Sequence, residues 1–323
     1  MAEQTNLLEQ AHLLFVLGPT ACGKSDLAVE IAERFSKSAS QPEIINCDSV
    51  QFFDAVDIGA AKPSRELLSR ARHHLIGHVP KGDKYTAGDF RRDAIKVIEE
   101  RVKEGVTTFL PVGGSGFYVQ ALEKGMFDVP PIDVEIKRSV EEDLSNKGLE
   151  MLYRELMERD PEAARKIQPA DRYRILRALE ILRSNLAGET LSAIKARFEQ
   201  TRQTPPFRVS KIGLFRPRDV LRVRVIERTR RMLSDGLIEE VEMLRSEGLH
   251  LWSPLLSVGY KEAQAFLDGE LKRNELEDAI VTSTMQLAKR QMTWFKKDPA
   301  IKWFDTEEGW EKPLQYASAK LAI

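Results

Sequence analysis

The sequence is poor in cysteine and in long apolar runs. Its 323 residues include only two cysteines, Cys22 and Cys47, too few and too far apart for a disulfide scaffold or a four-ligand zinc site. No apolar stretch approaches the ~20 residues of a membrane-spanning helix, and the first twelve residues lack the basic and apolar regions of a secretory signal. We therefore expect a cytoplasmic protein without a membrane segment.

Net charge is also nearly absent. Lys and Arg (49) balance Asp and Glu (50), so the net charge of -1 gives no global sign of a nucleic-acid partner. Basic residues nevertheless gather in three stretches, 165–183, 216–231 and 286–297, where they outnumber acidic ones. Such stretches indicate either a polyanion-binding surface or solvated helix faces whose arginines pair with Glu180 or Glu227, and charge alone leaves both open.

Four short apolar segments alternate with helical patterns along the chain. They are Leu13–Leu17, Glu43–Cys47, Thr107–Val112 and Ser210–Phe215, each rich in strand-forming residues. Strands that alternate with helices usually pair in parallel. The pattern therefore predicts an α/β fold with a parallel sheet flanked by helices.

The pattern changes between residues 129 and 199, where charged amphipathic helices follow one another without a convincing strand. Residues 219–297, after the fourth predicted strand, again have a helical pattern. The sequence thus predicts a core in two parts, residues 1–128 and 206–323. An all-helical insertion domain at 129–205 would interrupt it.

The strongest local motif runs from residue 18 to residue 25. It reads Gly-Pro-Thr-Ala-Cys-Gly-Lys-Ser and matches G-x-x-x-x-G-K-[ST], between a predicted strand and a predicted helix. Backbone N–H groups of such a loop close around phosphate oxygens, while Lys24 adds a positive charge and the Ser25 hydroxyl can ligate Mg²⁺. We predict a diphosphate- or triphosphate-binding loop with Mg²⁺ as cofactor, formed by Gly18, Pro19, Thr20, Ala21, Cys22, Gly23, Lys24 and Ser25.

A phosphate-binding loop does not say which bond breaks. The third predicted strand runs into Val112–Gly116 without the carboxylate that an ATPase usually places there, which weakens a plain NTPase interpretation. The second strand instead delivers Asp48 at its carboxyl end, where open α/β sheets bind ligands. Asp48 is therefore either a general base or the N-cap of a following helix.

Three histidines lie close together at His73, His74 and His78. Their spacing matches no zinc pattern, and no cysteine or acidic partner joins them in the sequence. We predict structural roles for all three.

A series of motifs in order from residue 18 to residue 295 resembles the tRNA dimethylallyltransferase family. The motifs read GPTACGKS, DSVQ, DIGAAKP, HHLIG with a later FRRDA, VGGSGFY, RALE, SVGYKE and QLAKRQMTWF. The resemblance implies a P-loop NTPase-like sheet and transfer of a dimethylallyl group from dimethylallyl diphosphate to an adenine of tRNA. The acceptor would be N6 of the adenosine just 3′ of the anticodon, position 37.

The resemblance also implies roles for single residues. Asp48 takes the proton of the adenine amine, and Lys24 with Mg²⁺ neutralises the departing diphosphate. Ser115, where family members usually carry threonine, supplies a hydroxyl near the amine or the diphosphate. Arg218 and Arg224 are implied to reach the diphosphate.

Three segments, 173–177, 256–261 and 289–296, together with residues 48–51 and Ser115, are implied to contact the anticodon stem-loop of tRNA. Helical spacing places Arg174 with Arg177, and Arg224 with Arg228 and Arg231, each set on one face suited to phosphates. For Trp294 and Phe295 we favour packing in the core over stacking on a base. The implied tRNA contacts are Asp48, Ser49, Val50, Gln51 and Ser115; Tyr173, Arg174, Ile175, Leu176 and Arg177; Leu256, Ser257, Val258, Gly259, Tyr260 and Lys261; and Lys289, Arg290, Gln291, Met292, Thr293, Trp294, Phe295 and Lys296.

Other functions stay open at this stage. A related enzyme could prenylate free adenylate, although the helical insertion and the basic stretches argue against so small an acceptor. A small-molecule P-loop kinase would use Asp48 to bind an acceptor hydroxyl. A non-catalytic RNA-binding NTPase module would depend on the basic helices alone. We expect a monomer.

Overall fold

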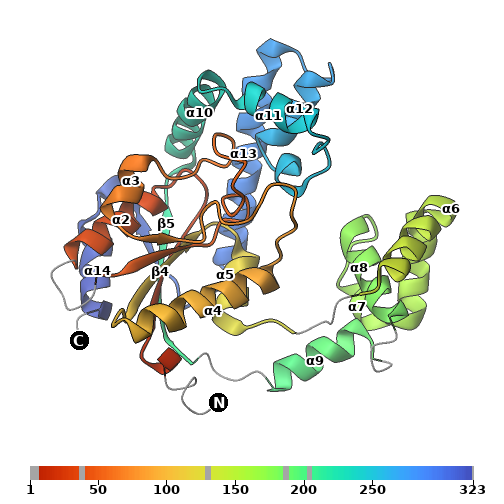
Figure 1. Cartoon of the computed structure of the whole chain (residues 1–323), viewed down its shortest axis with the longest axis horizontal. Helices are drawn as coiled ribbons and strands as arrows, with labels where there is room; N and C mark the ends of the chain where they lie inside the picture. Colours follow the sequence, from red (N-terminus) through yellow and green to blue (C-terminus); the bar gives the residue numbers. More distant parts are fainter. Residues whose placement is uncertain (1–6, 36–40, 128–131, 185–188, 202–205, 322–323) are drawn as a thin grey trace. The chain divides into compact units, whose positions relative to one another are not determined.

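The described part of the chain forms two compact units. The computed structural model describes residues 7–35, 41–127, 132–184, 189–201 and 206–321 (Figure 1). The sheet unit comprises residues 1–123 and 205–323, and the helical unit comprises residues 124–204. The predicted junctions, after residues 128 and 205, lie outside the described residues. None of the described helices is long and apolar enough to cross a membrane.

The sheet unit contains six parallel strands in the order β3-β2-β4-β1-β5-β6. They are β1 (His12–Leu17), β2 (Glu43–Asn46), β3 (His73–His74), β4 (Thr108–Gly113), β5 (Arg208–Phe215) and β6 (Lys302–Asp305). The parallel sheet and its four predicted strands are confirmed. The two edge strands, β3 and β6, were not predicted. Strand β3 has only two residues, and the sequence of β6, Lys-Trp-Phe-Asp, is not an apolar run.

Helices cover both faces of this sheet, which is why the central strand β1 is buried throughout. Alternation divides its side chains, so that Leu13 and Phe15 belong to one core cluster and Leu14 and Val16 to the other. Helices α2 (Lys24–Arg34), α3 (Arg65–Arg70) and α14 (Glu311–Leu321) contribute to the second cluster. Helices α4 (Ala87–Lys103), α5 (Gly116–Lys124), α11 (Leu237–Ser246), α12 (Tyr260–Leu267) and α13 (Arg273–Phe295) contribute to the first.

Helix α10 (Arg218–Ser234) packs on α13 through a small apolar cluster of its own. Leu221 and Val225 of α10 meet Val281 and Ala288 of α13 there. Two short 3₁₀ turns, η1 (Ser253–Leu256) and η2 (Thr306–Glu308), complete the sheet unit. The packing of α10 on α13 leaves another face of α10 free for polar residues.

The helical unit has its own core and, in its described residues, no strand. It contains α6 (Val134–Arg159), α7 (Pro161–Arg165), α8 (Arg172–Arg183) and α9 (Leu191–Thr201). Buried Asp160 joins two of its helices: its side chain accepts hydrogen bonds from Ala163 N at 3.0 Å and from Ser192 N at 2.9 Å. The predicted fold class, a parallel sheet flanked by helices with an all-helical insertion, is therefore confirmed.

Candidate active site

The phosphate-binding loop connects β1 to α2 with two glycines at positive φ. Gly18 has a φ of 146° and Gly23 a φ of 92°, and a Cβ at Gly18 would overlap the Leu214 carbonyl oxygen. Gly23 occupies the N-cap of α2 without a side-chain cap, so the first amides of the helix stay available to an anion. The Lys24 ammonium donates to the Pro19 carbonyl oxygen at 2.7 Å, which keeps it folded over the loop.

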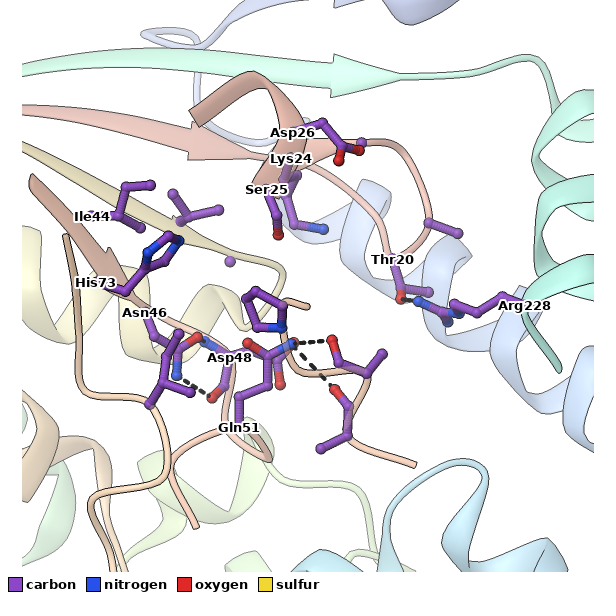
Figure 2. Close-up of a pocket in the computed structure, with 18 of the residues that line it drawn as sticks. Thr20, Lys24, Ser25, Asp26, Ile44, Asn46, Asp48, Gln51, His73 and Arg228 are labelled. Atoms are coloured by element: carbon purple, nitrogen blue, oxygen red, sulfur yellow. Dashed lines mark hydrogen bonds between the residues drawn. The ribbon is translucent and has the colours of Figure 1, made fainter. Parts of the chain in front are cut away.

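A cavity of about 500 Å³ lies at the carboxyl ends of β1, β2 and β4. Lys24, Ser25 and Asp26 line one side, and Asn46, Asp48 and Gln51 line the opposite side (Figure 2). Parallel strands bring these segments together because their carboxyl ends meet at the same edge of the sheet. Of the predicted loop residues, Gly18, Pro19 and Cys22 do not line the cavity.

Asp48 faces this cavity from the turn that follows β2. Its amide donates to Asn46 Oδ1 at 2.9 Å, and its Oδ1 accepts from the Val50 amide at 3.1 Å. No helix begins directly after Asp48, where the chain forms turns and bends, so the N-cap alternative is wrong. The local bonds hold the backbone of the turn and present the carboxylate to the cavity.

Ser115 lies in the turn between β4 and α5. Its hydroxyl accepts from the Ser49 amide at 3.2 Å and lies 3.2 Å from the Ser49 hydroxyl. Neither serine lines the cavity, and neither does Val50. Ser115 therefore supports the turn that carries Asp48 through its contacts with Ser49, without lining the cavity.

The glycines around Ser115 are required for packing within the protein. A Cβ at Gly113 would overlap the Cys47 carbonyl, one at Gly114 the Gln291 amide, and one at Gly116 the Trp294 indole. This turn therefore sits tightly against the end of β2 and against α13. Close approach of substrate is not needed to explain the three glycines.

Helix α10 supplies a row of arginines to the cavity. Arg224, Arg228 and Arg231 line it together with Glu227, and Arg228 Nη1 donates to Thr20 Oγ1 of the phosphate-binding loop at 2.9 Å (Figure 2). Burial lowers the pKa of Arg228, and the nearby Asp48 carboxylate partly offsets this. The guanidinium stays charged because its ordinary pKa is far above neutrality.

The predicted pair Arg218 and Arg224 is only half supported by this placement. Arg218 is exposed in the first turn of α10 and does not line the cavity. Helical spacing predicted that Arg228 and Arg231 share one face with Arg224, a face expected to suit tRNA phosphates, although Arg224 was also expected to reach the diphosphate. Helical spacing was the available signal, and it could not tell which part of the molecule the face meets.

The remaining wall is largely apolar, with Ile44, Ile76 and Val112 lining it. His73 lines it too, against the prediction of a purely structural role, and burial lowers the pKa of His73 so that its ring stays neutral near pH 7. The other two histidines fit that prediction. His74 Nε2 lies 2.7 Å from Glu43 Oε2, and His78 Nε2 lies 3.8 Å from an Asp93 carboxylate oxygen.

The predicted tRNA-contact residues in 173–177, 256–261 and 289–296 fall into three groups by exposure. Tyr173, Arg174, Leu256, Lys261, Lys289, Arg290, Thr293, Trp294 and Lys296 are exposed, whereas Ile175, Leu176, Gly259, Tyr260 and Phe295 are buried. The remaining residues of the three segments, Arg177, Ser257, Val258, Gln291 and Met292, are partly exposed. The buried residues pack inside the protein and the exposed ones are accessible, and contact with tRNA stays a prediction for both. The prediction of core packing is correct for Phe295 and wrong for Trp294, whose exposed fraction is 43%.

One of these residues reaches the phosphate-binding loop directly. Gln291 Oε1 on α13 accepts a hydrogen bond from the Thr20 amide at 2.8 Å. The same helix carries exposed Lys289, Arg290 and Trp294. Within the sheet unit, α13 thus joins the loop to a basic, partly aromatic surface.

Comparison with known proteins gives a consistent result. Residues 51–298 match the family model described as IPP transferase. The chain is 44% identical over 303 residues to a tRNA dimethylallyltransferase of Bdellovibrio bacteriovorus, covering 94% of this chain and 96% of the relative. It is 40% identical over 300 residues to one of Geobacter sulfurreducens, covering 92% of each. The solved full-length tRNA isopentenylpyrophosphate transferase of Bacillus halodurans superposes with a TM-score of 0.69 at 29% identity, covering 97% of both chains.

Proposed function

The chain belongs to the IPP transferase family, and on that premise we propose that it transfers a dimethylallyl group from dimethylallyl diphosphate to N6 of an adenine in tRNA. The N6–C1 bond forms as the bond between C1 and the diphosphate oxygen breaks. One amine proton goes to a carboxylate of the protein, and diphosphate leaves. The acceptor we propose is the adenine just 3′ of the anticodon, position 37.

One observation carries this proposal. Lys24 and Ser25, which suit a diphosphate, and Asp48, which suits a proton acceptor, line the same cavity of about 500 Å³. Prenyl transfer needs a held diphosphate with a base nearby, and the cavity offers this arrangement. A kinase could use the same residues on an acceptor hydroxyl, so the family match is what favours prenyl transfer over phosphoryl transfer.

The diphosphate would bind at the start of α2. The first amides of α2, the Lys24 ammonium and the Arg224 and Arg228 guanidinium groups give this end of the cavity its positive charge. Lys24 would exchange its bond to the Pro19 carbonyl for a phosphate oxygen. Positive charge at this position stabilises the leaving group as its own charge grows.

Mg²⁺ fits the same end of the cavity. Among the described residues no cluster of three or more histidine, cysteine or acidic side chains could hold a metal ion. Mg²⁺ commonly takes few protein ligands beside substrate phosphates and water, and the Ser25 hydroxyl lines the cavity as one such oxygen ligand. The ion would neutralise diphosphate charge there.

The five-carbon group would lie against the apolar wall formed by Ile44, Ile76 and Val112. Such a wall excludes water from the reacting carbon, which limits hydrolysis of the diphosphate ester. The adenine amine is a weak nucleophile because its lone pair is delocalised into the ring. Proton acceptance by Asp48 would therefore contribute ~10²- to 10⁴-fold to the rate.

The acceptor adenine must leave its stack to enter a cavity of this kind. That costs a few kcal/mol in a duplex and least in an unpaired anticodon loop. Exposed Lys289, Arg290 and Trp294 on α13, and Tyr173 and Arg174 on α8, are the residues that we assign to the anticodon stem-loop. We also propose that the active form is a monomer.

A single-turnover assay tests this function. Unmodified tRNA, Mg²⁺ and radiolabelled dimethylallyl diphosphate are mixed with the protein, beside one reaction with AMP as acceptor and one with γ-labelled ATP. We expect label in tRNA alone. Label that moves only to AMP would identify an adenylate prenyltransferase, and phosphate released only from ATP would identify an NTPase or kinase.

A further inference from the structure

The loop Asp57–Pro63 forms part of the cavity wall although it belongs to neither β-strand nor helix. Ala60, Ala61 and Pro63 line the cavity. Ala61 has a φ of 49°, a left-handed conformation that residues other than glycine rarely adopt. A loop in such a conformation needs bonds from outside itself to stay in place.

Glu240 of α11 supplies two of these bonds. Its Oε1 accepts from the Asp57 amide at 3.0 Å, and its Oε2 accepts from the Ile58 amide at 2.7 Å. A carboxylate that accepts from backbone amides makes charge-assisted hydrogen bonds, roughly twice as strong as neutral ones. Glu240 therefore holds the start of the loop with both of its oxygens.

Tyr260 of α12 holds the middle of the loop. Its side chain is fully buried, and its hydroxyl donates to Glu240 while it accepts from the Ala60 amide at 3.1 Å. Burial raises the pKa of Tyr260, with the Glu240 carboxylate adding to the rise, so the hydroxyl keeps the proton that it donates. A Cβ at Gly59 would overlap the Tyr260 ring, so the loop lies directly on the tyrosine.

The loop in turn holds Gln51, three residues after Asp48. Gln51 Nε2 donates to the Ala60 carbonyl at 3.2 Å and to the Ala61 carbonyl at 3.0 Å. An amide nitrogen has two hydrogens, and both are used by these carbonyls. The Gln51 amide is thereby oriented, and its oxygen is left as an acceptor on the side of the cavity that Asp48 also lines.

We propose that Glu240 and Tyr260, neither of which lines the cavity, are positioning residues for the acceptor base, and that they act through the loop Asp57–Pro63 on Gln51. This inference rests on the proposed prenyl transfer, and it replaces the expected direct contact of Tyr260 with tRNA. Two acceptors side by side, Asp48 and Gln51, suit an amine that carries two N–H donors. Loss of the Tyr260 hydroxyl frees the Ala60 amide and loosens the carbonyls that orient Gln51.

Tyr260→Phe tests the proposal because it removes one hydroxyl and keeps the buried ring. We expect kcat/KM for tRNA to fall ~10-fold, a typical cost of one buried hydrogen bond to a charged group, with KM for dimethylallyl diphosphate unchanged within about twofold. Tyr85→Phe is the matched control, since it removes a hydroxyl bond to Asp93 of 2.9 Å in the same unit but away from the cavity. A rise in KM for dimethylallyl diphosphate as large as the fall in kcat/KM for tRNA, or an equal fall in kcat/KM for tRNA in Tyr85→Phe, would overturn the proposal.

A double-mutant cycle shows whether the effect runs through Gln51. In a Gln51→Ala background, Tyr260→Phe should lower kcat/KM for tRNA by less than about a further twofold. Full additivity of the two losses would mean that Tyr260 acts by another route.

Hydrogen–deuterium exchange keeps this inference separate from the proposed function, because it needs no turnover. In Tyr260→Phe and in Glu240→Gln, amides of residues 57–60 should exchange at least ~10-fold faster than in the parent protein, with α4 and α13 unchanged. Unchanged exchange in that loop would overturn the positioning role, whatever the activity of the parent protein.

Discussion

Helices α10 and α8 each carry arginines spaced along one face, within two of the basic stretches of the sequence. On α10, Arg224, Arg228 and Arg231 line the cavity, and Arg228 donates to Thr20 at 2.9 Å. On α8, Arg174 lies 3.4 Å from Asp171 and Arg177 lies 2.9 Å from Glu180. The same pattern thus serves a cavity in the sheet unit and surface ion pairs in the helical unit.

The difference lies in what surrounds each cation. The ion pairs of α8 are partly exposed, and such pairs contribute only ~0–1 kcal/mol, so a phosphate can replace the carboxylate at little cost. Arg228 is more buried and bonds to a neutral hydroxyl. A desolvated cation whose hydrogen bond goes to a neutral hydroxyl binds an incoming anion strongly. The burial of each arginine and its bonding partner, rather than the spacing, separate the proposed diphosphate site on α10 from the proposed RNA-binding surface on α8.

The largest expected effect is at Asp48, on the opposite wall from the phosphate-binding loop. Asp48→Ala should slow single-turnover prenyl transfer at least ~10²-fold, because no group then accepts the amine proton. Affinity for tRNA, measured by filter binding, should stay nearly constant. Asp48→Asn should be as slow as Asp48→Ala, and normal turnover in either variant would remove Asp48 from the role of base.

A smaller effect is expected at Arg228, and it sharpens the contrast between the two helices. Arg228→Gln should lower kcat/KM for dimethylallyl diphosphate ~10- to 10²-fold, the range for loss of a charged hydrogen bond in a desolvated site. Arg177→Gln is the matched control on α8 and should leave that parameter unchanged within about twofold. Equal losses in the two variants would abolish the distinction drawn here.

The smallest effect is expected on α8 itself. Arg174→Gln combined with Arg177→Gln should flatten the plot of log Kd for tRNA against log salt by ~1 to 2, the slope of one to two phosphate contacts. Arg154→Gln, which breaks an exposed pair with Glu150 on α6, is the control. A slope identical to that of the parent protein would mean that the α8 arginines only pair with their neighbouring carboxylates.

The sequence-based prediction was most accurate where the signal is local. Residues 18–25 predicted the loop because glycine spacing, Lys24 and Ser25 lie within a single strand-to-helix connection. It was least accurate for the exposure of single side chains, which depends on tertiary packing. Tyr260, in a motif assigned to tRNA, is fully buried, whereas Trp294, expected to pack in the core, is 43% exposed.

Short-range pattern by itself determined the phosphate-binding loop, the four central strands and which arginines share a helix face. Only the tertiary structure decided what those faces meet. The Arg228–Thr20 bond joins residues 208 positions apart, and the Tyr260–Ala60 bond joins residues 200 apart. Contacts of that separation follow from how strands and helices pack, and the periodicity of one segment carries no information about its distant neighbour. The backbone of each element is therefore readable from the sequence, whereas the chemical surroundings of its side chains are a property of the folded chain.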